Sequence, residues 1–259
     1  MLNKINFFNK NGYCVVKIFS KKSIDSLNKS LTKKLFHKIK GSKFSLNNIH
    51  KINDEEYFLK ITKRNKRFIS FNRNVAKDIK KNQYLNDLLI DNWGTNNYAI
   101  KWVADPRKDP IKNDKVGYRV VRPRNYSNND AAGPHVDTHF KKNLKVPAYY
   151  FLTLWTPLNE FSTKNGLQIY PKTHLINHNI KVRDKNNTKV SPVLKKNYTK
   201  KFKHKKLLLK KGEVLIFHPN LIHGGGSGIG TNTRFSVEFR LYDKKRFLLY
   251  KKSILSKSD

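Results

Sequence analysis

The chain has 259 residues, and 55 Lys and Arg against 18 Asp and Glu give it a formal net charge of +37. It has no run of the roughly 20 apolar residues that a membrane span needs, and its first residues lack the apolar core of a signal peptide, so we expect neither. Cys14 is the single cysteine, which excludes a disulfide within the chain and favours a reducing, cytoplasmic setting.

The charge alone could indicate a partner rich in phosphate. Lysine far outnumbers arginine, however, and the lysines are dispersed along the whole chain together with many asparagines, as expected when an A/T-rich genome encodes a solvated surface. No zinc-finger or RNA-recognition motif is present. We therefore consider nucleic acid unlikely as a partner, and keep an anionic substrate, a carrier domain or a membrane surface as alternatives.

The first third of the sequence predicts helices. An apolar stretch that follows Asn11-Gly12-Tyr13 predicts a strand, and Ile24, Leu27, Leu31 and Leu35 at helical spacing predict a helix over Ser23–Ile39. A second helix is expected over Asn74–Asp91. Residues 1–95 are thus interpreted as helical support for a sheet and not as a separate domain.

The rest of the chain predicts strands around one long Lys/Asn-rich stretch. Residues 175–211 have few apolar positions at either period and are interpreted as an insertion or lid. We expect one domain over 1–259, mainly β with flanking α-helices, with its β core at about 98–243. The predicted strands are Tyr98–Val103, Gly117–Val121, His135–Phe140, Ala148–Thr156, Leu167–Tyr170, Glu213–Phe217 and Thr233–Tyr242.

The last predicted strand alternates strictly. Its polar positions are Arg234, Ser236, Glu238 and Arg240, and its apolar positions are Phe235, Val237 and Phe239. Alternate residues of a strand point to opposite faces. The polar face could simply meet water, but we prefer an interior lining, with the apolar face packed under the helices.

His135 and Asp137 stand two positions apart, so both side chains leave the same face of a strand and can converge on one ion. Two histidines and one carboxylate are the ligands of a mononuclear non-haem iron(II) site, which leaves one face open for a 2-oxo acid and dioxygen. His218 and His223 both lie near the end of a later strand and compete for the third position. His139 continues the alternation and is assigned to the pocket wall or to the surface.

An arginine can hold a carboxylate co-substrate beside such a site. Arg234 follows His223 by eleven positions, and a glycine-rich turn fills most of that gap. A hairpin would return Arg234 to the neighbourhood of the metal.

Five blocks in order resemble the phytanoyl-CoA dioxygenase-like (PhyH) family of Fe(II)/2-oxoglutarate oxygenases. They are His135-Val136-Asp137, Leu154-Trp155-Thr156-Pro157-Leu158, the segment Asn165–His174, Gly212–His218, and the His223 segment with Arg234-Phe235-Ser236. The chain departs from the family at Val136, where glutamine is frequent, and at Lys172-Thr173, where Gly-Ser is usual.

The resemblance implies a double-stranded β-helix, the jelly-roll or cupin-like barrel, with iron(II), 2-oxoglutarate and dioxygen at the site. It favours His223 over His218 as a ligand, and it implies that Arg234 and Ser236 bind the 5-carboxylate of 2-oxoglutarate. Thr153 and Trp155 are expected beside the co-substrate or the substrate. Because Asp137 is retained, hydroxylation of a small molecule is favoured over halogenation.

The substrate is expected to be a small and possibly anionic or carrier-linked metabolite. Arg119, Arg122 and Arg124 concentrate arginine before the metal strand, and Arg122 is the preferred contact for an anionic group. A nucleic-acid-modifying oxygenase and a non-oxygenase, cupin-like metal-binding protein stay as alternatives.

Overall fold

The fold is that of a computed structural model, which describes residues 2–38, 48–57, 68–101, 115–126, 130–137, 151–161, 164, 166–176, 178, 194, 197–226, 228 and 232–255. Its larger sheet has the strand order β1-β8-β5-β10-β4-β2, with β3 paired to β10. All of these pairings are antiparallel. The strands are β1 (Tyr13–Lys17), β2 (Phe68–Ser70), β3 (Tyr98–Lys101), β4 (Lys115–Val121), β5 (Phe151–Pro157), β8 (Glu213–Phe217) and β10 (Arg234–Asp243).

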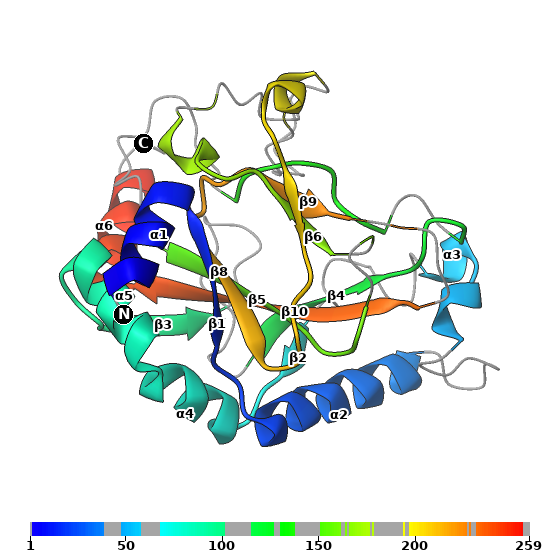
Figure 1. The fold of residues 1–259 in the computed structure, drawn as a ribbon. Helices are drawn as coiled ribbons and strands as arrows, with labels where there is room; N and C mark the ends of the chain where they lie inside the picture. Colours follow the sequence, from blue (N-terminus) through cyan, green and yellow to red (C-terminus); the bar gives the residue numbers. More distant parts are fainter. Residues whose placement is uncertain are drawn as a thin grey trace.

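A smaller antiparallel sheet has the order β7-β6-β9, formed by β7 (Lys205–Leu207), β6 (Leu167–Ile169) and β9 (His223–Gly225). An isolated bridge pairs His135 with His223 at this sheet. In Figure 1, β6 and β9 lie on one side of the long strands of the larger sheet, and helices lie on the other. The predicted mainly β fold with flanking helices is confirmed by this arrangement.

The helices are α1 (Leu2–Asn11), α2 (Lys21–Lys38), α3 (Asp54–Glu56), α4 (Arg73–Lys81), α5 (Gln83–Trp93) and α6 (Lys244–Leu255). Short 3₁₀ turns are η1 (Ile49–Lys51), η5 (Thr173–Leu175) and η6 (Tyr198–Lys201). Of the helices in the described ranges, none has the length and apolar character to cross a membrane.

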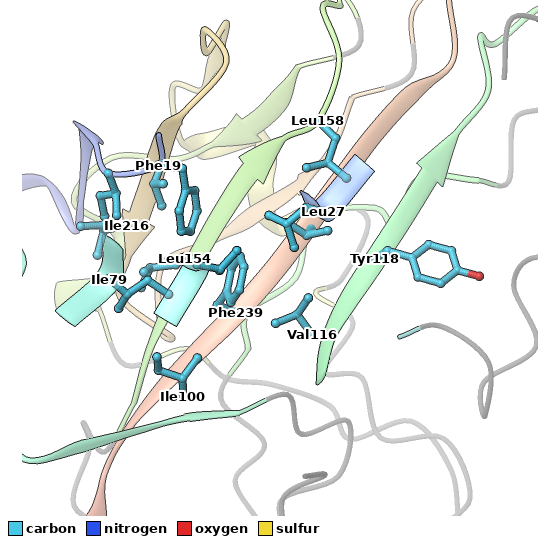
Figure 2. Packing of buried hydrophobic residues seen from close by; sticks show 14 of the residues in the cluster. Phe19, Leu27, Ile79, Ile100, Val116, Tyr118, Leu154, Leu158, Ile216 and Phe239 are labelled. Carbon is cyan, nitrogen blue, oxygen red and sulfur yellow. The ribbon is translucent and has the colours of Figure 1, made fainter. Parts of the chain in front are cut away.

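The main core lies between the helices and the outer face of the larger sheet. Leu27 of α2 and Ile79 of α4 meet Leu154 of β5 and Phe239 of β10 in one buried cluster (Figure 2). Burying each such side chain contributes about 1.5–3 kcal/mol. Phe235 and Val237 belong to the same cluster, so the apolar face of β10 packs under the helices as predicted. The polar face of β10 therefore points between the two sheets.

A second core joins the sheets to each other. Trp155 of β5 and Phe217 of β8 pack with Leu167 and Ile169 of β6, and all four side chains are buried. Because the facing surfaces are apolar here, the sheets stay in contact, and the polar groups of β10 and β9 meet beside this contact.

Three predicted elements need correction. The single helix over Asn74–Asp91 is two helices, α4 and α5, separated at Asn82. Residues 175–211 are not wholly irregular, since their described part holds η6 and β7, and β7 pairs with β6. In the predicted strand His135–Phe140, His135 forms only the isolated bridge, and residues 138–140 lie outside the described part.

Candidate active site

His135, Asp137 and His223 come together between the sheets. One ligand atom from each lies within 4.8 Å of the others, so the group could hold a metal ion. Reciprocal backbone bonds fix the histidines: His135 N donates to His223 O at 2.8 Å, and His223 N donates to His135 O at 2.9 Å. Asp137 N donates to Pro219 O at 2.8 Å, which ties the third ligand to the turn before β9.

The hydrogen bonds of both imidazoles suit metal binding. His135 Nδ1 lies 2.8 Å from Gly133 O, and His223 Nδ1 lies 3.0 Å from Leu221 O. A carbonyl oxygen can only accept, so each Nδ1 carries the proton and each Nε2 keeps its lone pair for a metal. Burial, helped by the nearby His223, lowers the pKa of His135 to about 3, so this ring is neutral at physiological pH.

The Asp137 carboxylate is held by both of its oxygens. Thr153 Oγ1 donates to Oδ2 at 2.8 Å, and Arg240 Nη2 donates to Oδ1 at 3.1 Å. Burial alone would raise the pKa of Asp137, but Arg240, the two histidines and the Thr153 hydrogen bond outweigh burial and hold the pKa below its usual range. The carboxylate is therefore ionised and oriented before any metal arrives.

A pocket of about 360 Å³ opens beside the triad. His135 and His223 line it together with Arg234, Trp155 and Arg119. Arg234 is 2% exposed and lies over the Trp155 ring, 5.5 Å from the ring centroid. Burial, assisted by the positive charge of Arg119, lowers the pKa of Arg234 to about 10. A carboxylate bound in this pocket would offset the cost of burying the guanidinium.

Two of the residues expected at the co-substrate have different surroundings. Thr153 donates to Asp137, so it supports this carboxylate of the triad, and its expected contact with the co-substrate stays a prediction. Ser236 is fully buried on the inward face of β10, and within the described ranges its hydroxyl has no hydrogen-bond partner. Trp155 lines the pocket as expected, and His139 lies outside the described residues.

Arg122 does not reach the pocket, which corrects its assignment to the substrate. Its Nε and Nη2 donate to the two oxygens of Asp130 at 2.8 and 2.9 Å, and Nη2 also donates to Asp54 at 2.6 Å. Its guanidinium lies 3.8 Å from the centroid of the Tyr57 ring, and Nη1 donates to Ile52 O. Arg122 thus joins loops of the fold, whereas Arg119, three positions earlier, lines the pocket.

His218, the competing third ligand, lies away from the triad. Its ring packs on His174 with centroids 5.3 Å apart, and its Nδ1 accepts from Asn220 N at 3.0 Å. The residue that the sequence interpretation missed is Arg240 as a partner of Asp137. Its signal was the polar alternation of β10, which placed Arg240 on the inward face without indicating what it meets.

The comparisons with known proteins agree with this geometry. The family model described as "Phytanoyl-CoA dioxygenase (PhyH)" matches residues 8–236. No curated protein is detectably similar to the chain in sequence.

Solved structures share the fold. EctD from S. alaskensis, solved with 2-oxoglutarate and 5-hydroxyectoine, is 15% identical with a TM-score of 0.57, over 95% of this chain and 77% of that one. The carbocyclase SnoK from nogalamycin biosynthesis is 12% identical with a TM-score of 0.54, over 94% of this chain and 84% of that one. The epimerase SnoN, solved with Fe³⁺, alpha ketoglutarate and nogalamycin RO, is 11% identical with a TM-score of 0.53, over 93% and 83%. The predicted double-stranded β-helix is confirmed as the fold class.

Proposed function

The chain belongs to the phytanoyl-CoA dioxygenase (PhyH) family, which makes it an iron- and 2-oxoglutarate-dependent enzyme, and from this premise we propose that it hydroxylates a small anionic molecule. One observation carries the proposal. The two histidines of the His135, Asp137 and His223 triad line the same pocket as the buried guanidinium of Arg234. A metal-binding barrel without oxygenase activity would not need a buried arginine beside its metal.

The donor set fits iron(II), because two imidazole nitrogens and one carboxylate leave coordination positions open for a co-substrate and dioxygen. Iron bound there would supply the activation of dioxygen that is coupled to decarboxylation of 2-oxoglutarate. In the balanced reaction, substrate R–H, dioxygen and 2-oxoglutarate give R–OH, succinate and carbon dioxide. The chain contributes binding, orientation and exclusion of water.

Arg234 is the proposed partner of the 5-carboxylate of 2-oxoglutarate. Its planar fork binds a carboxylate through two bonds, and its contact with Trp155 restricts the side chain before the co-substrate arrives. Ser236, two positions along the same face of β10, is the proposed second donor. Leu167 and Phe217 line the same pocket with apolar surface, which excludes water and strengthens the ion pair.

Arg119 takes the place first given to Arg122 as the proposed contact for the substrate. Its side chain is 36% exposed, and its Nη2 lies 3.9 Å from Glu238 Oε2, a long contact that an anionic group of the substrate can replace. Glu238 would keep its other partner, Arg240, at 3.0 Å.

The test is a succinate-release assay with iron(II), ascorbate and 2-oxoglutarate. Removing a bidentate partner from a desolvated carboxylate costs on the order of 2–5 kcal/mol. Arg234→Ala should therefore raise the 2-oxoglutarate concentration that the enzyme requires by a factor between about 30 and several thousand. Iron binding should be unchanged, and Arg234→Lys should recover only part. An unchanged requirement in Arg234→Ala would remove Arg234 from the co-substrate site.

Product mass separates hydroxylation from the other reactions found on this fold. Hydroxylation adds one oxygen atom to the substrate, whereas epimerisation leaves the mass unchanged. With a panel of anionic metabolites, Arg119→Gln should reduce the substrate-coupled turnover while uncoupled succinate formation survives. A neutral substrate whose turnover ignores Arg119 would refute the anionic assignment.

A further inference from the structure

We propose that the protein has a second ligand site, which takes an organic phosphate with at least two negative charges. The site is a cavity of about 630 Å³ lined by Lys172, Lys201, Lys203 and Lys205, here called the lysine pocket. Among the described residues, it shares no lining residue with the pocket beside the triad. The inference is therefore independent of the proposed hydroxylation.

The charged residues that line the lysine pocket all carry positive charge. His204 also lines it, and its described lining contains no Asp or Glu. Like charges gathered around one cavity repel each other and focus a positive potential, which a multiply charged anion relieves.

Lys172 is held in a backbone conformation that costs free energy. Its φ of 68° is the left-handed region, and it is the single non-glycine residue with positive φ in the described part of the chain. The Cβ of an L-residue clashes there with the following carbonyl, so glycine would be the unstrained choice. Such strain persists where the surroundings impose it, and it gathers at functional sites.

The surroundings of Lys172 do impose its conformation. Its N–H donates to Asn11 O at 3.0 Å, and its carbonyl accepts from Leu175 N at 3.2 Å. The hydroxyl of the next residue, Thr173, donates to Tyr170 O at 2.7 Å and accepts from Ile222 N at 3.0 Å. These hydrogen bonds fix the turn that carries Lys172, so its backbone is held in place at the lining of the pocket before a ligand binds.

The part of the lining formed by Lys201, Phe202 and Ile176 is partly apolar. The ammonium group of Lys201 lies 4.3 Å from the Tyr198 ring centroid and 5.2 Å from that of Phe202, so cation–π contacts restrict this side chain. Phe202 and Ile176 line the pocket, and Ile176 is 37% exposed. This apolar surface suits the organic part of a ligand.

The choice of lysine distinguishes this pocket from the one beside the triad. Arg119 and Arg234, whose forks match a carboxylate, line the triad pocket, whereas the cations of the second pocket are lysines. An ammonium is a compact point charge with three donors and no fixed plane, which suits the several oxygens of a phosphate group. The ligand class is thus a phosphate ester or polyphosphate.

The first experiment is calorimetric titration of the full, metal-free chain with ADP, tripolyphosphate and adenosine at about 0.15 M salt. ADP and tripolyphosphate should bind, and adenosine should not. Lys201→Ala/Lys203→Ala should weaken ADP binding by at least about tenfold, since hydrogen bonds to charged groups contribute about 1.5–3 kcal/mol each. Lys80→Ala/Lys81→Ala removes the same charge from exposed positions on α4 and should change the affinity less than about twofold.

Substitutions at Lys172 separate the effect of its charge on ADP binding from the effect of its backbone strain on the melting temperature. Lys172→Gly should weaken ADP binding and raise the melting temperature, because the charge is lost while the strain is relieved. Lys172→Ala should weaken binding equally and leave the melting temperature nearly unchanged, because alanine keeps the strained conformation.

Three results would overturn the proposal. They are no binding of ADP or tripolyphosphate to the unmodified chain, an equal loss of affinity in Lys80→Ala/Lys81→Ala, and loss of binding in Arg234→Ala. The last would assign the anion to the pocket beside the triad. Binding that survives Arg234→Ala and fails in Lys201→Ala/Lys203→Ala supports the lysine pocket even if the chain proves to have no oxygenase activity.

Discussion

At the scale of single residues, the site depends on how its ligands are held. Thr153 and Arg240 each donate to one oxygen of Asp137, and two backbone carbonyls fix the protonated nitrogens of the histidines. Such outer partners orient the ligands and keep their donor atoms in the form that binds metal. Metal affinity should therefore respond to residues that never touch the metal.

Thr153 offers the cleanest test of this dependence. Thr153→Val keeps the shape but removes the donor to Asp137, and it should lower the affinity for iron(II) or manganese(II) by about 10- to 100-fold. Thr153→Ser should restore most of it, and the 2-oxoglutarate requirement of metal-saturated enzyme should stay the same. Metal titration followed by calorimetry measures the effect. A variant that binds metal normally but needs more 2-oxoglutarate would return Thr153 to the co-substrate site.

Arg122 should matter for stability rather than for substrate. The side chains of Arg122 and Asp130 are 1% and 2% exposed, so Arg122→Ala would leave a buried carboxylate without its charged partner, although the backbone N–H of residue 122 would still donate to it. Breaking such a pair typically costs about 3–5 kcal/mol, which urea unfolding would detect. The KM for 2-oxoglutarate should not change in the folded fraction. A stable Arg122→Ala variant with poor substrate coupling would contradict the ion-pair role.

Arg122 also shows what the sequence could not predict, namely which carboxylates of the chain pair with it. Its partner Asp54 is 68 positions away and Asp130 is eight positions away, across a turn. A cluster of arginines near the metal strand predicted an anion, but it could not indicate that two carboxylates of the chain itself neutralise one of them. Arg119 lies on β4, which ends at Val121 before Arg122 and Arg124, and it faces the pocket together with Val121 because alternate residues of a strand share a face.

At the scale of elements, the helix predicted over Asn74–Asp91 contains a break that the sequence did signal. Val75 and Ile79 share one helical face, but the next buried position after Ile79 in register would be at 82 or 83, and Asn82 and Gln83 stand there. Asn82 ends α4 and begins α5, and its side chain accepts from Leu85 N at 3.0 Å.

Asn82→Ala should destabilise the fold by about 1 kcal/mol, because the first turn of α5 loses its N-cap. Asn82 Nδ2 also donates to Lys17 O at 3.2 Å, so the junction is tied to β1. Asn82→Ser keeps a capping oxygen and should recover most of the loss, as measured by thermal unfolding. If alanine proves neutral, α4 and α5 do not depend on this cap.

Helix α6 was missed for a related reason. Asp243 ends β10, and its Oδ1 accepts from Lys245 N at 2.9 Å and from Arg246 N at 3.1 Å, as an N-cap does. The strand residues before it carried the prediction through Tyr242, and the period-2 pattern gave no warning of a helix. An aspartate at the end of a strand, followed by helix-forming residues, was the available signal.

At the scale of the whole molecule, the sequence predicts features that depend on local patterns better than it predicts contacts between distant segments. The spacing of His135 and Asp137 indicated a shared face, and the alternation of β10 indicated an inward polar surface. The preference for His223 over His218 rests on the family resemblance, because no local pattern indicates the bridge that joins His135 to His223, 88 residues apart in the chain. The lysine pocket likewise gathers Lys172 with Lys201 and Lys203 from separate segments, so dispersed lysines in the sequence gave no hint of it.

Cys14, the single cysteine, can serve as a probe of unfolding because it is buried. Cys14 lies in β1, is 3% exposed, and accepts a hydrogen bond from the Tyr84 hydroxyl at 3.1 Å. Burial raises the pKa of the Cys14 thiol from 9.0 to about 12, against the smaller opposing effect of Tyr84. The buried thiol contributes fully to the free energy of unfolding below pH 9. This contribution is lost as the pH rises toward 12, because the thiol ionises in the unfolded chain before it ionises in the folded one.

Alkylation of Cys14 should therefore require unfolding, since the thiolate is the reactive form. Under native conditions, iodoacetamide should label the chain far more slowly than it labels the chain in denaturant, and the rate should follow the unfolding curve. Saturating manganese(II) and 2-oxoglutarate should slow labelling further, because ligands that bind only the folded state stabilise it. If these ligands slow global unfolding but leave labelling unchanged, β1 separates locally from β8, and the edge of the larger sheet opens on its own.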